Sequence, residues 1–332
     1  MSTSEAIHAF WKWWPGAAPG FAASFSTGEH SEALIEEMNA HVKAIDAGLD
    51  WEFGPGHESE HHLCLSGHGD PELRILAERW REKAPAADAT WEFHGARQPH
   101  PSRDLTLTID GVDVALAEIR YDLEVEEDRA RVIVKGWHPT YGAIEDESLR
   151  RRILFIALDT LLGEDDVERW IGEVAVADEP VEEGATPTDL RATVEELSEL
   201  SQEDMWQMLR GDDDGKPVLV VVDRSVKRVD HWLKDTLMRV HVTLTSANED
   251  GVPSKDESEV LNEAEDALLE SLGTHAVYIA RETRAGARTL FFHIEESSPA
   301  VDAAARWKPS AEHVVKLEIE RDPAWDVLDR WG

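Results

Sequence analysis

The sequence predicts an α+β protein of two domains, each a largely antiparallel sheet with helices packed on one face. At 332 residues the chain is long for one hydrophobic core and comfortable for two. Apolar residues recur at helical spacing in some segments and alternate with polar residues in others, which predicts both helices and strands. A stretch rich in Glu, Pro, Gly and Ala separates two such sets of segments. We therefore expect an N-terminal α+β domain over residues 1–178, a linker and helical arm over 179–215, and a C-terminal α+β domain over 216–332.

The chain carries a formal net charge of −36, from 69 acidic and 33 basic side chains. Such a field repels nucleic-acid phosphates and anionic lipids over a Debye length of about 8 Å. Neither nucleic acid nor a membrane is therefore an expected partner. Three explanations of the charge stay open: it keeps a solvated surface soluble, it docks a basic protein partner, or it reflects adaptation to high salt.

The sequence also predicts a cytoplasmic location. It has no run of about 18 apolar residues that would span a membrane. Its first residues lack the basic segment and apolar core of a signal peptide. The single cysteine, Cys64, excludes an intramolecular disulfide framework. These observations leave the oligomeric state open.

In the N-terminal domain, helix and strand signals follow one another. Pro15 should end a first short helix, and Asp70-Pro71 supplies the N-cap and the first-turn proline that open a later one. The strands expected between residues 105 and 137 should form an antiparallel meander. Helices are expected over residues 4–14, 30–44 and 146–162, and strands over 49–53, 60–66, 90–93, 105–109, 112–125, 131–137 and 171–176.

The segment that joins the two domains is expected to be helical. Thr186-Pro187-Thr188-Asp189 can start a helix, because an acid at the third position completes a capping box. The helix can restart at Ser201–Asp204, and Gly211-Asp212-Asp213-Asp214-Gly215 then breaks it. The apolar residues of the restarted helix are Met205, Trp206, Met208 and Leu209.

The C-terminal domain has the clearest signals. Ser254 and Glu257 match a capping box that opens a helix, and Gly273 closes it. A hairpin then covers residues 278–294, and Asp322-Pro323 opens a last helix. The other expected elements are strands over residues 218–222, 237–245 and 314–319 and a short helix over 299–307.

Several short motifs occur in order along this domain. They are Gly215-Lys216-Pro217, Glu249-Asp250-Gly251-Val252-Pro253, Glu257 with Leu261 and Glu265, Tyr278 with Arg281, Thr283 and Gly286, Phe291-Phe292, and Asp322-Pro323-Ala324-Trp325. In this order they resemble the bacterial Domain of Unknown Function 695 family, over roughly the last third of the chain. That family has no established activity and no agreed catalytic residues, so the resemblance assigns no role to any residue here.

A cluster of possible zinc ligands lies in a predicted hairpin of the N-terminal domain. Strand alternation places His62 and Cys64 on one face and His61 on the other, so we expect polar hairpin tips and no metal site. Cys64 is expected to pack as a small apolar side chain, because no base is placed beside it. No nucleotide-binding or cofactor motif occurs, so no cofactor is expected. The full cluster is His57, His61, His62, Cys64 and His68.

The strongest candidates for ligand binding are Arg281, Glu282, Thr283 and Arg288 in the C-terminal hairpin. In one interpretation they maintain the fold, with the arginines paired to Glu282 or Glu295 across the strands. In the other, the two arginines bind a carboxylate or phosphate bidentately, and Thr283 adds a hydroxyl.

The first functional hypothesis is a non-enzymatic cytoplasmic module for protein interaction or regulation, which contacts a basic protein partner. The alternative is a small-ligand-binding or enzymatic site in a cleft between the domains, around Arg281 and Arg288. A third hypothesis is an immunity-type protein whose charge masks the active site of a toxin. Whether the chain is an enzyme stays open, since no complete catalytic motif occurs.

Overall fold

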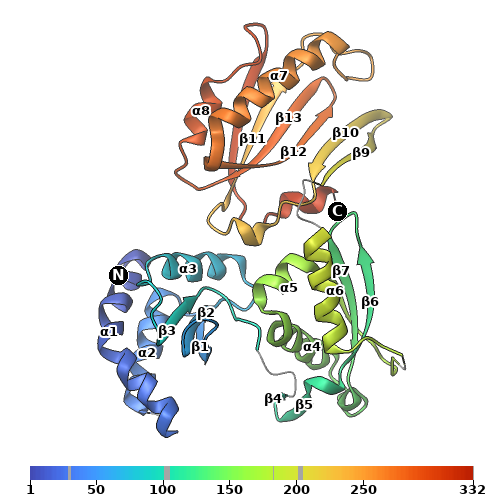
Figure 1. Cartoon of the computed structure of the whole chain (residues 1–332). Coiled ribbons are helices and arrows are strands. Elements are labelled where there is room, and N and C mark those ends of the chain that lie inside the picture. The colour runs from blue at the N-terminus through green and yellow to red at the C-terminus, as the bar shows by residue number, and fades with distance from the viewer. Residues whose placement is uncertain (29–30, 101–104, 182, 201–204, 332) are drawn as a thin grey trace. The chain divides into compact units, whose positions relative to one another are not determined.

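The computed structural model describes residues 1–28, 31–100, 105–181, 183–200 and 205–331. The chain forms two compact units, Met1–Leu200 and Ser201–Gly332 (Figure 1). Each unit combines helices with sheets in which most neighbouring strands are antiparallel. The predicted α+β class is therefore confirmed.

The N-terminal unit begins with two helices over a small sheet. Its first elements are α1 (Thr3–Thr27), α2 (Glu32–Ile45), β1 (Asp50–Pro55), β2 (His61–Ser66), α3 (Pro71–Glu82) and β3 (Trp91–His94). Strands β1 and β2 are antiparallel, whereas β2 and β3 are parallel. Asp70 caps α3 through its side chain, as its position before Pro71 predicts.

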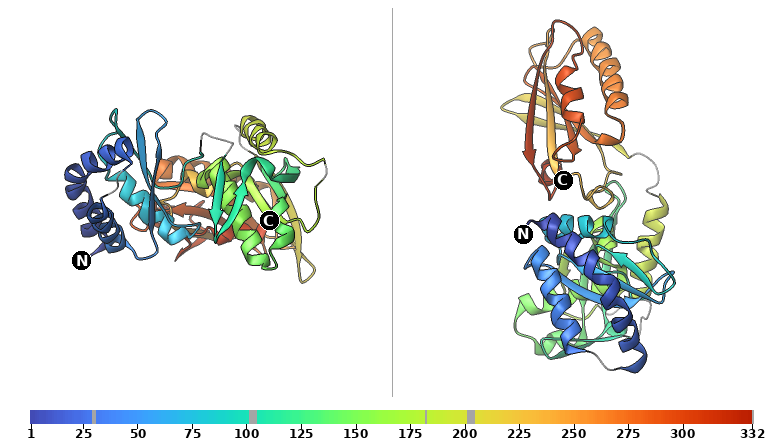
Figure 2. Two further views of the ribbon diagram at one scale, coloured as in Figure 1. Left: turned by 90° about the horizontal axis from the view of Figure 1, so that it is seen from below. Right: turned by 90° about the vertical axis from the view of Figure 1, so that its left-hand side faces the viewer.

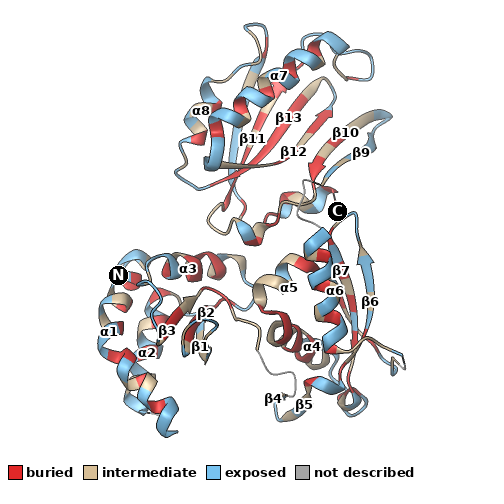
Figure 3. Cartoon of the chain, viewed as in Figure 1, coloured by how far each residue is buried: buried red, intermediate tan, exposed pale blue. Residues whose placement is uncertain are grey.

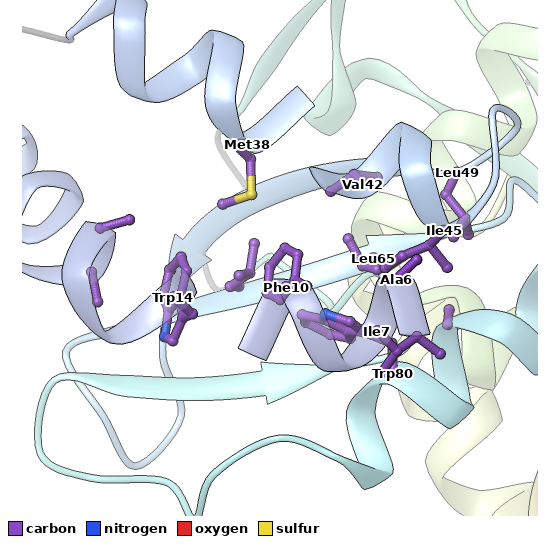
Figure 4. Close-up of a cluster of buried hydrophobic side chains, with 14 of the residues drawn as sticks. Ala6, Ile7, Phe10, Trp14, Met38, Val42, Ile45, Leu49, Leu65 and Trp80 are labelled. Atoms are coloured by element: carbon purple, nitrogen blue, oxygen red, sulfur yellow. The ribbon is translucent and has the colours of Figure 1, made fainter. Parts of the chain in front are cut away.

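The prediction that the first helix ends at Pro15 is wrong, because α1 continues through Pro15 and Pro19. Both prolines lie on the exposed side of the helix. The opposite side is buried and carries Phe10 and Trp14 (Figure 4). Phe21 is buried on the same helix. Packing of this aromatic face outweighs the backbone hydrogen bonds that the two prolines remove.

The rest of the unit contains two further sheets. Its elements are β4 (Thr106–Ile109), β5 (Val112–Ala115), β6 (Arg120–Glu126), β7 (Arg131–Trp137), α4 (Glu147–Leu162), α5 (Glu164–Trp170), β8 (Ile171–Val176) and α6 (Pro187–Leu200). Strands β4 and β5 pair with each other, and β6, β7 and β8 form a three-stranded sheet in which β7 and β8 are parallel.

The single strand predicted over residues 112–125 is wrong, because a 3-10 turn at Leu116–Glu118 separates β5 from β6. Leu116 and Ile119 are both buried. Residues with odd separation point to opposite faces of a regular strand, so an unbroken strand would expose one of them. The turn allows both side chains to enter the core.

The C-terminal unit is built on one six-stranded antiparallel sheet, in the order β14-β11-β13-β12-β10-β9. Helices α7 and α8 cover one face, and a C-terminal 3-10 helix packs on the other (Figure 2). Burial is greatest in the central strands (Figure 3). The elements are β9 (Trp206–Asp213), β10 (Lys216–Asp223), β11 (Thr236–Thr243), α7 (Lys255–Leu272), β12 (Ala276–Arg284), β13 (Ala287–Ile294), α8 (Ala300–Arg306), β14 (Val314–Arg321) and the 3-10 helix Asp326–Trp331.

The predicted helical arm over Met205–Leu209 is wrong, because Trp206 to Asp213 form the edge strand β9. The helical spacing of its apolar residues is overridden by pairing along all of β10, from Trp206↔Asp223 to Asp213↔Lys216. Leu209 packs on the core beside the C-terminal 3-10 helix. The predicted restart at residues 201–204 lies outside the described residues. The last helix, expected to begin at Asp322-Pro323, is the short 3-10 helix Asp326–Trp331.

Among the residues that the structure describes, no helix combines the length and the apolar character that crossing a membrane requires.

Candidate functional site

Arg281 and Arg288 lie close together on neighbouring strands, beneath α7. Arg281 Nη1 donates to Glu265 Oε2 at 2.9 Å, and Arg288 Nη1 donates to Glu265 Oε1 at 2.6 Å. The side-chain oxygen of Asn262 accepts from both arginines, at 3.1 and 3.0 Å. The two guanidinium groups therefore hold one carboxylate, as in the bidentate hypothesis, but this carboxylate is supplied by the chain itself.

The partner of the arginines differs from the cross-strand acids that the sequence suggested. Glu265 comes from α7, where it replaces an apolar residue in the stripe that contains Leu261 and Leu268. A buried acid needs a cation beside it. The position of Glu265 within this apolar helical pattern is a signal that could have been found in the sequence. Glu295 instead lies 3.5 Å from Lys234.

The other two candidates, Glu282 and Thr283, point to opposite faces of β12. Thr283 shares the α7 face with Arg281 and is buried. Glu282 lies on the other face, 3.3 Å from Arg330 in the C-terminal 3-10 helix and 3.7 Å from Arg284. The four residues therefore do not converge on one point, and ligand binding by them stays a prediction.

The edge strand β9 presents a second feature on the α7 face of the sheet. Trp206 and Met208 are 46% and 75% exposed. They lie opposite Asp223 and Val221 of β10, and the ring of Trp206 is 5.7 Å from that of Tyr278. Within the described residues β9 pairs with β10 alone. Its outer edge is thus available for another strand.

The histidine and cysteine cluster divides as strand alternation predicts. His62 and Cys64 are buried on one face of β2, whereas the ring of His61 packs 4.5 Å from Phe25. Burial, and then the charges of Glu52 and Glu164, raise the pKa of the Cys64 thiol. Cys64 is therefore a poor nucleophile. In the described part of the chain no group of three His, Cys, Asp or Glu is placed to hold a metal.

The N-terminal unit also contains a cavity of about 1250 Å³. Its charged lining includes Glu52, Arg97, Asp159 and Glu164, and His62 lies in its wall. In the sequence, His62 stands out only as a member of the histidine and cysteine cluster, and no sequence signal marks the carboxylates. They come from two regions far apart in the chain, Glu52 from β1 and Asp159 and Glu164 from the junction of α4 and α5, so no local motif connects all three.

Comparison with known families identifies the C-terminal unit. Residues 204–329 match the family of unknown function DUF695. The match covers the whole six-stranded sheet, both helices of the unit and most of the final 3-10 helix. It confirms the resemblance that the motifs from Gly215 to Trp325 predict. Neither a curated protein nor a solved structure matched the chain.

Proposed function

We propose that the DUF695 unit is a non-enzymatic interaction module that binds an extended, basic segment of a partner protein along β9. The observation that carries the proposal is the exposed edge strand with Trp206 and Met208 beside each other on one face. An edge strand has a row of unpaired main-chain groups, and a bound strand can complete the sheet by pairing with them.

The two edges of the sheet differ in a way that favours β9. On β14 the exposed apolar residues Val314 and Ile319 are separated by the charged side chains of Lys316 and Glu318. Interspersed charges of this kind protect an edge from pairing. On β9 a tryptophan and a methionine occupy successive positions of one face, and both types are common in protein-binding surfaces.

The charges around β9 favour a partner with lysine or arginine. Asp212, Asp213 and Asp214 lie at the end of the β9–β10 hairpin and are exposed. Arg210 is the only basic residue within β9. The net charge of −36 also favours encounter with a basic partner. A strand with alternating apolar and basic side chains would place the apolar ones beside Trp206 and Met208.

The proposal is tested by selecting short peptides from a display library against the full chain. We expect peptides that alternate apolar residues with lysine or arginine, and their binding should weaken as salt is raised. Met208→Lys should abolish the binding, because it places a charge on the apolar edge. Val314→Lys, at an exposed apolar site on β14, should leave it unchanged. Equal binding to both variants would contradict the proposal.

A further inference from the structure

The cavity of the N-terminal unit brings acids from separate elements to one space. Glu52 lies on β1, Asp159 near the end of α4, and Glu164 at the start of α5, while Arg97 follows β3. The sharp change of direction between α4 and α5 occurs at Gly163, whose φ is 83°. Apolar side chains form much of the remaining wall, including Leu107, Phe155, Ile156, Val167 and Ile171.

Glu52 and Glu164 have partners, and Asp110, which also lines the cavity, pairs with Arg152. Glu52 Oε2 lies 3.1 Å from Arg97 Nε. Glu164 accepts from Ser66 Oγ at 2.5 Å and from the Arg97 backbone N–H at 3.0 Å. Among the described residues, the carboxyl group of Asp159 has no hydrogen-bond or ion-pair partner. Arg97 is thus engaged by Glu52 and Arg152 by Asp110, while Arg131, which also lines the cavity, is exposed and forms no ion pair with Asp159. The charge of Asp159 is therefore left without a cation of its own.

The electrostatic state of Asp159 reflects this imbalance. Burial, and then the charges of Glu164 and Glu52, raise its pKa to about 7 against the opposing charge of Arg97. At neutral pH the group is therefore divided between its acid and its carboxylate. A cation bound beside it would favour the carboxylate.

His62 supplies an independent sign that this cavity receives a ligand. Its side chain is 5% exposed, and its Nδ1 lies 3.0 Å from the carbonyl oxygen of Pro55. A carbonyl oxygen only accepts, so Nδ1 carries the proton and Nε2 presents a lone pair. Nε2 is buried and has no hydrogen-bond partner in the described structure. Burial lowers the pKa of His62, which favours this neutral form.

The backbone opposite His62 leaves space for the ring. Gly54 pairs with His62 across β1 and β2, and both residues line the cavity. A β-carbon at Gly54 would lie 2.4 Å from Cε1 and 2.7 Å from Nε2 of His62. Any side chain at residue 54 would therefore displace the imidazole from its present position.

We propose that this cavity binds an organic cation, with an ammonium or guanidinium group on an apolar body. The charged group pairs with Asp159, an N–H of the ligand is accepted by His62 Nε2, and the apolar body lies against the aromatic and aliphatic wall. A metal ion fits less well, since it needs several converging ligands and the described residues provide no such set.

The experiment is calorimetric titration of the full chain with hexylamine, and with hexanol and hexanoate as neutral and anionic controls of the same length. Hexylamine should bind and the two controls should bind about tenfold more weakly or not at all. Because hexylamine stays protonated, its affinity should rise as Asp159 ionises through pH about 7. This pH profile is measured on the unaltered chain and needs no variant.

Variants then assign the residues. Asp159→Asn should weaken hexylamine binding about tenfold or more, and Gly54→Ala should weaken it by displacing His62. Asp122→Asn, at an exposed position of β6, should have no effect. Equal affinity for hexylamine and hexanol, a flat pH profile, or full binding by Asp159→Asn would each overturn the proposal. None of these results bears on peptide binding at β9, so the two proposals fail independently.

Discussion

Arg288 and Glu265 form a buried ion pair, with Nη1 and Oε1 2.6 Å apart and each side chain 6% exposed. The pair joins β13 to α7, and Arg281 adds a second contact to the same carboxylate at 2.9 Å. A charge in this position is tolerated only while its partners are present. Arg281 and Arg288, which the sequence marks as candidates for ligand binding, therefore hold α7 to the sheet.

Replacement of the shared carboxylate should destabilise the C-terminal unit. Glu265→Gln leaves two guanidinium groups without a counter-charge, and it should lower the free energy of unfolding by about 3–5 kcal/mol. Urea denaturation measures the change. Glu263→Gln, at an exposed position of the same helix, should change it by less than about 0.5 kcal/mol. A loss below about 1 kcal/mol in Glu265→Gln would show that the arginines do not depend on this acid.

A second buried acid, Glu257, should make stability depend on acid pH. Burial alone would raise its pKa, but hydrogen bonds from the Thr245 and Ser246 main chain and hydroxyls lower it to about 2. Its Oε1 also lies 3.1 Å from His313 Nε2. Glu257 caps a strand end instead of returning to the N–H of Ser254, so only the Ser254 half of the predicted capping box forms.

The expected pH effect follows from the lowered pKa. Glu257 takes up its proton near pH 4.5 in the unfolded chain and near pH 2 in the folded chain. Its contribution to stability is therefore fully present above pH 4.5 and is lost as the pH falls to about 2. Glu257→Gln should cost about 1–3 kcal/mol at neutral pH, since it removes hydrogen bonds to a charged group. Denaturation curves should show the difference from the wild type shrinking towards pH about 2. A difference independent of pH would be contrary to this account.

Asp159 should have the opposite effect on stability. Its folded pKa of about 7 lies above its ordinary value of 3.8, so the folded chain binds more protons between these values and stability falls as pH rises through them. Asp159→Asn should therefore raise the free energy of unfolding by about 1–2 kcal/mol above pH 7, after allowance for its partial exposure. Below pH 4 the variant and the wild type should agree in thermal denaturation. If Asp159→Asn instead destabilised the protein at high pH, the conclusion that the Asp159 carboxylate lacks a stabilising partner would be wrong.

The turn at Gly251 should tolerate no β-carbon. Its φ is 76°, its carbonyl accepts from Gly286 N at 2.9 Å, and a β-carbon would lie 2.8 Å from that nitrogen. Gly251→Ala should cost about 2–4 kcal/mol, because strain and overpacking act together. Gly215→Ala shares the positive φ but has open space around it, and it should cost about 1 kcal/mol by urea denaturation. If the two variants lost the same unfolding free energy, close packing around Gly251 would not explain the effect.

Much of the fold could be predicted from local patterns, because caps and alternation act within a few residues. Asp70 before Pro71 marks α3, and Ser254 marks α7, as the structure shows. The failures have a common cause. Aromatic packing of α1 and strand pairing of β9 are long-range effects, and they override the local signals of Pro15 and of helical spacing.

The sites were harder to predict than the elements. Arg281 and Arg288 were identified as a pair, yet Glu265 lies on a helix and not on a neighbouring strand. The cavity acids Glu52 and Asp159 are more than a hundred residues apart in the sequence and meet only in the folded unit. Contacts between residues so far apart depend on the tertiary structure, and they cannot be predicted from the spacing of residues along the chain.

The most direct test of the proposed interaction is hydrogen–deuterium exchange on the full chain, with and without a peptide selected from the library. A bound strand would pair with the outer edge of β9, so amides of Trp206–Asp213 should become protected. Amides of β14 and of the N-terminal unit should exchange at unchanged rates. Protection at β14, or none at β9 while the peptide is bound, would contradict the account.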